Sequence, residues 1–306
     1  MASAQQVMGH EISPARRAAF QVLAGGSAGF LEVCIMQPLD VVKTRMQIQA
    51  RPTATGEVHY NGVFDCFAKM YRQEGISSFW KGILPPILAE TPKRAIKFLT
   101  FEQTKQFFQF GSPQPTPLTF SLAGLTAGTI EAIAVNPFEV VKVAQQADRQ
   151  KKMVGTYAVA REIVQRDGFG LSGLNKGLTA TMGRNGVFNM VYFGFYHSVK
   201  NVVPPSEDHT LEFLRKVCIG FIAGTLACFV NIPFDVAKSR IQGPQPVQGV
   251  IKYRGTLSSM ALVYNEEGFR ALYKGLVPKI MRLGPGGAIL LLVFEYAYEY
   301  LCTNFP

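Results

Sequence analysis

The stretch QPLDVVKTRMQIQ, residues 37–49, decides the fold of this chain because it is present three times. The related stretches are NPFEVVKVAQQ, residues 136–146, and IPFDVAKSRIQ, residues 232–242. Each has a proline, an acidic residue two positions later, a lysine three positions after the acid and a glutamine four positions after the lysine. These residues are Pro38, Asp40, Lys43, Gln47, Pro137, Glu139, Lys142, Gln146, Pro233, Asp235, Lys238 and Gln242. Agreement at so many offsets indicates three complete copies of a repeat of about 100 residues.

The repeat also predicts the domain organisation. Proline-rich polar linkers at residues 111–117 and 204–209 separate the copies. We therefore expect a polar N-terminal tail over residues 1–17, followed by repeats over residues 18–111, 112–206 and 207–306. A G-x-x-x-G pair, which permits close approach of helices, begins thirteen residues before each proline. These pairs are Gly25/Gly29, Gly124/Gly128 and Gly220/Gly224.

The composition favours a membrane protein. Of the 306 residues, 48% are hydrophobic and only 17% are charged, which is a low share for a soluble protein. The net charge of +10 (31 − 21) is compatible with nucleic acid binding, but the basic residues are spread along the chain and many follow apolar runs. The first 17 residues lack the apolar core of a secretory signal. Five cysteines without a C-x-x-C motif indicate packed thiols in a reducing compartment.

Six segments are long enough to cross a bilayer as helices. Residues 20–39, 118–138 and 217–234 carry at most one charge each and lead into the proline motif. The second segment of each repeat carries more charges, and it follows a Lys-Gly step each time; these segments are residues 83–110, 178–202 and 278–301. A charged side chain in a spanning helix must face protein or water, so we expect these three helices to line an aqueous cavity.

Between the two spanning segments of each repeat lies a short amphipathic stretch that ends in an acid and a glycine, at residues 62–74, 157–167 and 253–267. A helix of this kind lies along the membrane surface. The expected fold is therefore an all-α membrane protein. It has six transmembrane helices in three tandem pseudo-threefold repeats, each with one amphipathic surface helix.

The proline motif predicts where charged groups of the three repeats meet. Pro38, Pro137 and Pro233 each remove a backbone hydrogen bond and bend their helix, so that three related helices converge at one end. There the acids and lysines of the motif are able to pair between helices, and the i, i+3 spacing also permits pairing within a helix. The motif glutamines lie one turn further on and are expected to hydrogen-bond across the pairs.

Counting from the Lys-Gly steps locates a substrate site. Seven residues beyond the glycine stand Ala89, Arg184 and Arg282, and eight beyond it stand Glu90 and Asn185 in the first two repeats. Two arginines at one depth suit a small dianion, because each guanidinium binds a carboxylate in two-pronged fashion. The substrate-binding residues expected from this register are Arg184, Arg282, Lys93, Lys97, Asn185 and Glu90. The alternative for each cation is that it reaches out to the membrane interface.

Two acids lie inside the apolar segments at matched positions. Glu32 and Glu131 each stand six residues before the motif proline, where repeat 3 has Ala227. Carboxylates inside a membrane are functional candidates. The sequence leaves three roles open for them: binding the cations of an empty cavity, carrying a proton, or serving as structural partners of a basic residue.

The motif P-x-[D/E]-x-x-[K/R], repeated three times with an acid-Gly phrase and a Lys-Gly step after it, resembles the mitochondrial carrier family over residues 20–301. The resemblance implies an inner-membrane protein with both termini toward the intermembrane space and the proline motifs and amphipathic helices toward the matrix. It also implies a matrix gate in which Asp40 pairs with Lys142, Glu139 with Lys238 and Asp235 with Lys43. A second, cytoplasmic gate is implied near Glu102, Lys105, Lys200 and Glu295, and it is incomplete in this chain.

Longer phrases, among them LPPILAETPKRAIKF and NIPFDVAKSRIQGPQP, are similar to family members that exchange 2-oxodicarboxylates such as 2-oxoadipate and 2-oxoglutarate. The expected function is therefore antiport of these anions by alternating access, with the bilayer, and cardiolipin at the matrix-side helix ends, as partners of a functional monomer. The alternatives are a proton or fatty-acid conductor, another anion carrier of the same fold, and a soluble nucleic-acid-binding protein. The sequence shows no metal-ligand cluster and its four histidines are scattered, so we expect no enzyme activity, cofactor or metal.

Overall fold

The computed structural model describes residues 14–49, 59–112, 114–149, 154–204, 208–245 and 251–304, and these contain helices and no strand. The predicted tail lies outside the described residues up to residue 13, as do parts of the predicted linkers. The long helices are α2 (Pro14–Ile48), α4 (Leu84–Phe107), α5 (Pro117–Ala147), α7 (Leu178–Val202), α8 (His209–Gln242) and α10 (Leu276–Asn304). The shortest, α4, has 24 residues and is about 36 Å long, which exceeds the hydrocarbon thickness of about 30 Å. The predicted all-α fold is confirmed.

Hydropathy alone singles out only some of these helices. Within the described residues, three helical stretches are long and apolar enough to cross a membrane, namely 117–147, 211–242 and 269–304. Two of them carry the proline motif, and the third is the second long helix of repeat 3, which the sequence had suggested would be less apolar. The assignment of α2, α4 and α7 as spans therefore depends on their length and on the repeat.

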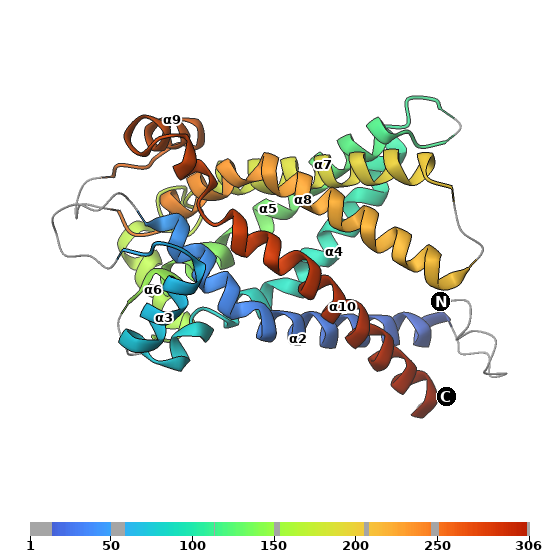
Figure 1. Ribbon diagram of the computed structural model, residues 1–306, viewed down its shortest axis with the longest axis horizontal. Coiled ribbons are helices and arrows are strands. Elements are labelled where there is room, and N and C mark those ends of the chain that lie inside the picture. The colour runs from blue at the N-terminus through green and yellow to red at the C-terminus, as the bar shows by residue number, and fades with distance from the viewer. Residues whose placement is uncertain are drawn as a thin grey trace.

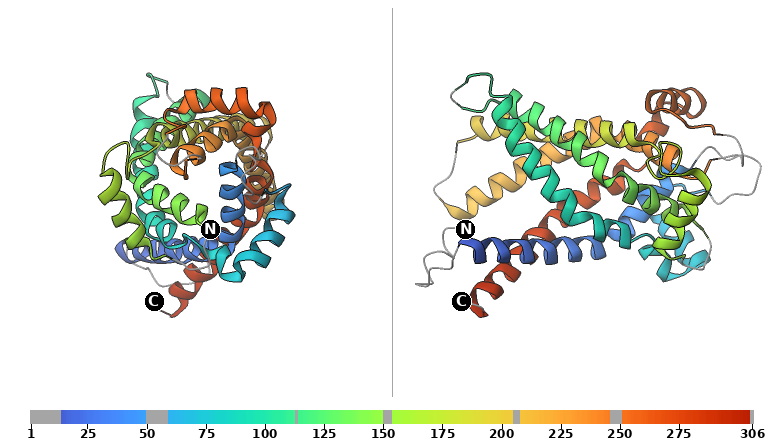
Figure 2. Two further views of the ribbon diagram at one scale, coloured as in Figure 1. Left: turned by 90° about the vertical axis from the view of Figure 1, so that its left-hand side faces the viewer. Right: turned by 180° about the vertical axis from the view of Figure 1, so that it is seen from behind.

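The proline lies inside its helix in each repeat and does not end it. The helix continues beyond Pro38 to Ile48, beyond Pro137 to Ala147 and beyond Pro233 to Gln242. This extension carries the motif lysine and glutamine, which the apolar segments read from the sequence had left outside. In both side views, α2 changes direction along its second half, toward the axis of the bundle (Figures 1 and 2).

The six long helices surround a common axis, as the end-on view shows (Figure 2, left). The short helices α3 (Val63–Glu74), α6 (Thr156–Asp167) and α9 (Thr256–Glu267) lie at one end, which we call the motif end. The described ends of the chain lie at the other (Figure 1), as an even number of spans requires. Two 3-10 helices, η1 (Ile76–Trp80) and η2 (Phe269–Tyr273), follow α3 and α9.

Each short helix packs against the end of the proline-bearing helix of its own repeat. In repeat 1, the buried residues Val41 and Val42 of α2 belong to one cluster with Cys66 and Met70 of α3. Equivalent clusters join α8 to α9 and α5 to α6. The glycine that ends each short helix has a φ of 78° to 84°, a left-handed conformation that glycine adopts without steric cost.

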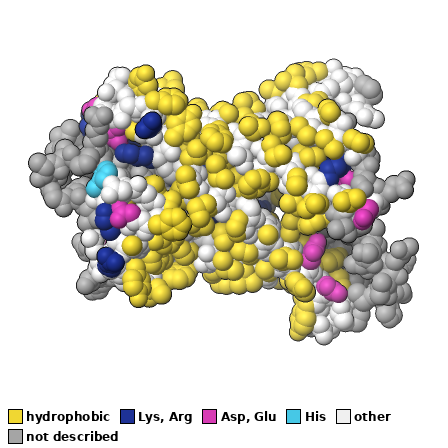
Figure 3. All heavy atoms as spheres, in the orientation of Figure 1, with side chains coloured by type: hydrophobic (Ala, Val, Ile, Leu, Met, Phe, Trp, Pro, Cys, Tyr) yellow, Lys and Arg dark blue, Asp and Glu magenta, His cyan; other side chains and the backbone are white. Residues whose placement is uncertain are grey.

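On the face shown in Figure 3, a broad apolar surface covers the middle of the bundle, while the charged side chains gather toward its two ends. Large apolar side chains project outward along the long helices, including Phe98 of α4 (62% exposed) and Leu118 of α5 (62% exposed). An exposed apolar band of this extent is explained by acyl chains as the surrounding solvent.

The glycine pairs do not play the same part in all three repeats. A Cβ placed on Gly124 would lie 2.7 Å from the backbone oxygen of Asn189, and one on Gly128 would lie 2.4 Å from that of Asn185. A Cβ on Gly25, by contrast, would meet nothing within 4 Å. The close approach expected of every pair is therefore present between α5 and α7 and missing at Gly25. On the α7 side of this contact, a Cβ on Gly186 would lie 2.9 Å from Leu125 Cδ1, so glycines on both helices permit the close approach.

Candidate functional site

The motif acids and lysines form ion pairs between repeats at the motif end. Lys142 Nζ lies 2.6 Å from Asp40 Oδ2, Lys238 Nζ lies 2.6 Å from Glu139 Oε2, and Lys43 Nζ lies 3.0 Å from Asp235 Oδ2. Each acid contacts the lysine of the next repeat in cyclic order, and none of the three pairs with the lysine of its own helix within the described residues. We call these six residues the ion-pair ring.

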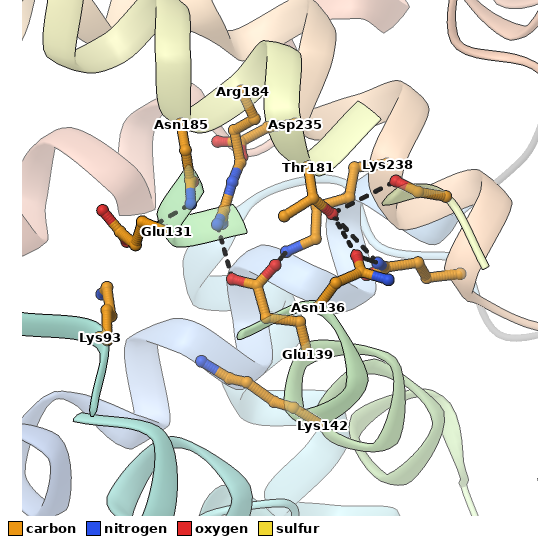
Figure 4. A network of polar contacts seen from close by, with 12 residues as sticks. Lys93, Glu131, Asn136, Glu139, Lys142, Thr181, Arg184, Asn185, Asp235 and Lys238 are labelled. Atoms are coloured by element: carbon orange, nitrogen blue, oxygen red, sulfur yellow. Dashed lines mark hydrogen bonds and ion pairs between the residues drawn. The ribbon is translucent and has the colours of Figure 1, made fainter. Parts of the chain in front are cut away.

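Each acid of the ring also binds a second cation. Arg282 Nη1 lies 3.0 Å from Asp40 Oδ1, and Arg184 Nη2 lies 2.6 Å from Glu139 Oε1. Lys279 Nζ lies 2.7 Å from Asp235 Oδ2. Figure 4 shows the guanidinium of Arg184 and the ammonium of Lys238 reaching the carboxylate of Glu139 from two directions.

The second cations come from α7 and α10, on the cavity side of the ring. Sequence reasoning missed Lys279, although it stands four residues after the Lys-Gly step and one turn before Arg282. That spacing puts Lys279 and Arg282 on the same face of α10, and it is the signal in the sequence that identifies Lys279 as a site residue.

A cavity of about 390 Å³ adjoins the ion-pair ring, and its lining includes Asp40, Lys43 and Asp235 of the ring. Its volume is in the range of small-molecule sites. The lining is polar and ionic, with buried amides from Asn185, Asn189 and Asn231 among the charged groups. The charged residues that line it are Glu32, Asp40, Lys43, Lys93, Lys97, Glu131, Arg184, Asp235, Lys279 and Arg282. Six cations against four acids leave the lining with an excess of positive charge, which favours an anionic ligand.

The two arginines predicted to bind substrate both line this cavity, but neither projects freely into it. Arg282 also donates from Nη2 to Glu32 Oε1 at 2.8 Å, so its guanidinium bridges two acids. Arg184 contacts Glu139, and its Nε lies 3.9 Å from Asp235 Oδ1. Both guanidinium groups are therefore held in place by acidic side chains of the protein.

The remaining predicted site residues divide into two groups. Lys93, Lys97 and Asn185 line the cavity, whereas Glu90 does not. Glu90 instead accepts a hydrogen bond of 2.6 Å from Arg94 Nε on the same helix, and its placement in the substrate site is corrected. The reason is rotational: one residue beyond Ala89, the side chain of a helix points about 100° away from the cavity-facing side. Lys97 has no ion-pair partner in the described part of the chain, and its Nζ lies 5.8 Å from the ring centroid of Phe193.

Comparison with known proteins agrees with this geometry. The sequence pattern of the mitochondrial carrier protein family matches residues 16–112, 113–207 and 209–305. The chain belongs to the mitochondrial carrier family. Membership makes it a multi-pass transporter of the mitochondrial inner membrane and not an enzyme, and the predicted family resemblance is confirmed.

Several curated carriers are similar over nearly the whole chain. The mitochondrial 2-oxodicarboxylate carrier of Homo sapiens is 60% identical over 96% of this chain and 98% of its own length. The mitochondrial 2-oxodicarboxylate carrier 2 of Saccharomyces cerevisiae is 39% identical over 90% of this chain and 91% of its own length. The mitochondrial citrate transporter D of Aspergillus niger is 42% identical, with coverage of 92% and 93%.

The motif glutamines of this carrier do not hydrogen-bond across the ion pairs, so that expectation is corrected. Thr44 Oγ1 donates to Gln146 Oε1 at 2.6 Å, Ser239 Oγ donates to Gln47 Oε1 at 2.8 Å, and Gln242 Nε2 donates to Asn136 Oδ1 at 3.0 Å.

Each glutamine also packs against the Lys-Gly glycine of another repeat. A Cβ on Gly275 would lie 2.9 Å from Gln47 Cγ, one on Gly177 would lie 3.2 Å from Gln242 Cγ, and one on Gly82 would lie 3.4 Å from Gln146 Cγ. Each motif glutamine therefore fills a contact between two repeats, one helical turn beyond the motif lysine.

Among the residues that the structure describes, no second ring of ion pairs joins the helices at the opposite end of the carrier. Glu102 pairs with Lys105 at 2.5 Å, but both residues belong to α4, so this pair connects no two helices. Within the described residues, neither Glu295 nor Lys200 makes an ion pair. The predicted cytoplasmic gate is therefore not formed in this conformation, in which the motif end is the closed one.

Beyond the ring, two buried arginines tie the short helices to the bundle. Arg45 pairs with Glu74 of α3 and donates from Nε to the backbone oxygen of Gln146. Arg240 pairs with Glu267 of α9 and donates to the backbone oxygen of Gln47. Repeat 2 has Ala144 at the equivalent position and lacks this link. Sequence reasoning did not identify the two arginines, although each stands two residues after the motif lysine.

Hydrogen bonding controls the charge state at these links. Burial alone would raise the pKa of Glu74, but hydrogen bonds from Arg45 and Lys81 outweigh it and hold that pKa below its ordinary value. The pKa of Glu267 is lowered in the same way against burial, by Arg240 and Lys274. Both carboxylates are therefore charged wherever the carrier is folded near neutral pH.

Proposed function

We propose that this carrier exchanges 2-oxodicarboxylates, among them 2-oxoglutarate and 2-oxoadipate, across the mitochondrial inner membrane. The observation that carries the proposal is the position of Arg184 and Arg282. They come from different repeats, face one cavity and are already oriented by acids. A cavity with an excess of cations and two such guanidinium groups fits a small dianion. The names of relatives at 60% identity support this substrate class.

The same contacts suggest how binding opens the carrier. Arg282 holds Asp40 and Arg184 holds Glu139, while Lys97 makes no ion pair within the described residues. We infer that the substrate carboxylates bind these three cations and displace the ring acids from the arginines. Each of these two acids then keeps only its lysine.

A ring weakened in this way is able to part, because water hydrates the separated charges and the net strength of buried ion pairs is small. Substrate binding at one central site thereby drives the change of access.

We also propose the finer assignments that the family resemblance implies. The motif end faces the matrix, and both termini face the intermembrane space. The ring is the matrix gate, bent into place by Pro38, Pro137 and Pro233. A cytoplasmic gate forms from the region of Glu102, Lys105, Lys200 and Glu295 when the ring opens. The carrier works as a monomer in the bilayer, with cardiolipin at the matrix-side helix ends.

Reconstitution tests the proposal directly. The purified carrier is placed in liposomes that contain 2-oxoglutarate, 2-oxoadipate, citrate or no anion, and uptake of labelled 2-oxoglutarate is measured. Exchange predicts uptake only into liposomes loaded with a substrate, and most strongly with the two oxodicarboxylates. Equal uptake into empty liposomes would contradict exchange and favour an anion or proton conductor. Uptake driven by citrate alone would favour the activity named for the Aspergillus niger relative.

A further inference from the structure

The carboxyl group of Glu131 is buried beside the cavity with almost no polar partner. Its side chain is 2% exposed and belongs to the cavity lining. Asn185 Nδ2 donates to Oε1 over a long distance of 3.4 Å, and Oε2 has no hydrogen-bond partner among the described residues. A carboxylate that served only as a structural partner would have its oxygens satisfied.

The internal repeat supplies a matched comparison. Glu32 occupies the same position in repeat 1, six residues before its proline. Its carboxylate accepts from Arg282 at 2.8 Å and lies 4.0 Å from Arg94 Nη2. Arg94 does not line the cavity, so a ligand there leaves Glu32 with a partner. Among the described residues, Glu131 has no cation outside the cavity lining with which to pair.

The charge of Glu131 is balanced only from a distance. Arg184 of α7 and Lys97 of α4 attract it, yet neither makes an ion pair with it. In Figure 4, Lys93 and Glu131 face the same open space with no contact between them. The other charged groups that line this space are Glu32, Asp40 and Lys43 on α2, Asp235 on α8, and Lys279 and Arg282 on α10.

A dicarboxylate would remove this balance. Under the proposed function, the substrate carboxylates bind Lys97 and Arg184, the two cations that offset the charge of Glu131. They also bring two negative charges into a site where the dielectric constant is low. Like charges at close range favour the neutral form of one of them, and among the acids that line the cavity Glu131 is the one with no ion pair to a described residue.

We propose that Glu131 takes up a proton when a dicarboxylate binds, so that the carrier moves one proton together with each anion. The proton comes from water on the side of entry and binds at Oε2, the oxygen that has no partner. The resulting O–H donates to a substrate carboxylate. When the anion leaves, the proton returns to water on the other side and the carboxylate is restored.

This inference rests on the proposed function and adds a co-transported ion to it. In one-for-one exchange of like substrates, the two proton movements cancel. The coupling is therefore visible as a link between anion binding and pH: each anion bound takes up a proton, and the apparent affinity for the anion falls by up to about tenfold per pH unit as the pH rises.

The experiment uses purified full-length carrier in detergent and in a weakly buffered solution with a pH indicator. Addition of 2-oxoglutarate is expected to cause uptake of one proton per anion bound at neutral pH. Glu131→Gln is expected to bind 2-oxoglutarate, as followed by thermal stabilisation, without proton uptake. Glu32→Gln is the matched control and is expected to keep the uptake for each anion bound.

Proton uptake in binding-competent Glu131→Gln equal to that of the wild type would overturn the inference, and so would wild-type binding without uptake. Glu131→Asp keeps the carboxyl group and decides the matter if the glutamine variant does not fold; binding without uptake in this variant also overturns it. Wild-type exchange in liposomes without proton uptake on binding overturns this inference alone. Absence of both exchange and binding overturns the proposed function, and this inference with it.

Discussion

Arg282 donates a hydrogen bond to Asp40 over 3.0 Å, so one side chain both lines the cavity and contacts the ion-pair ring. Arg184 joins Glu139 in the same way at 2.6 Å. Under the proposed function, substrate recognition and closure of the motif end therefore use the same guanidinium groups. An anion cannot bind these guanidinium groups fully without loosening the contacts that keep the motif end closed.

Replacement of either arginine is expected to abolish most of the exchange. Arg184→Ala and Arg282→Ala each remove a buried two-pronged cation and leave its acid partner less compensated, which costs about 2–5 kcal/mol. The initial rate of labelled 2-oxoglutarate exchange should fall by at least about 30-fold. Arg270→Gln, an exposed position in η2, is the control and should exchange normally. A wild-type rate in either cavity variant would show that the site is placed wrongly.

Exchanging the acid and the lysine of one ring pair is not expected to preserve the stability of the carrier. Asp40→Lys with Lys142→Asp restores opposite charges between the two positions, but the introduced lysine then faces Arg282. We expect the double variant to be less thermally stable than the wild type. Addition of Arg282→Gln should recover part of the melting temperature without recovering exchange. A fully active double variant would mean that Arg282 does not bind Asp40.

Acid is expected to loosen the link between α3 and the bundle. The pKa of Glu74 is lowered in the folded state, so its stabilising effect is complete above the ordinary glutamate pKa, about 4.3, and is lost as the pH falls through the lower folded value. Glu74→Gln should reduce stability at neutral pH by about 3–5 kcal/mol, because it leaves Arg45 buried without its partner. Its melting temperature should then change less on acidification than that of the wild type.

Glu266→Gln is the control for this comparison, because Glu266 pairs at the surface with Lys252 and has a side chain that is 42% exposed. It should melt close to the wild type at neutral pH. Equal melting curves for Glu74→Gln and Glu266→Gln across the pH range would contradict the assignment.

Two equivalent glycines are expected to differ sharply when they are replaced by alanine. Gly124→Ala places a methyl group against the backbone of Asn189 and should destabilise the carrier by about 1–3 kcal/mol. Gly25→Ala meets open space and should be neutral or stabilising by about 0.5–1 kcal/mol, because alanine favours the helix. Melting temperatures in detergent measure both. The same loss in both variants would mean that the two helix pairs pack alike.

Much of the architecture could be predicted because the repeat supplies three readings of each signal. The bounds of α7 match the predicted segment, residues 178–202, and α3, α6 and α9 begin and end within three residues of the predicted stretches. The register from the Lys-Gly steps predicted a shared site for Arg184 and Arg282, and both line the same cavity. Such features depend on residues close together in the chain, where helix geometry converts spacing into position.

The contacts across repeats had to come from the three-dimensional arrangement. Which acid an arginine reaches depends on how far apart helices of different repeats stand, and no spacing along one helix contains that distance. For the same reason, sequence reasoning missed Lys279 and included Glu90, which does not line the cavity. It also could not show that the motif glutamines pack against another repeat and not against the ion pairs. Identical motifs also acquired different partners: Glu32 is held by two guanidinium groups while Glu131 is left nearly alone, because burial and pairing belong to the neighbours that folding brings to each copy.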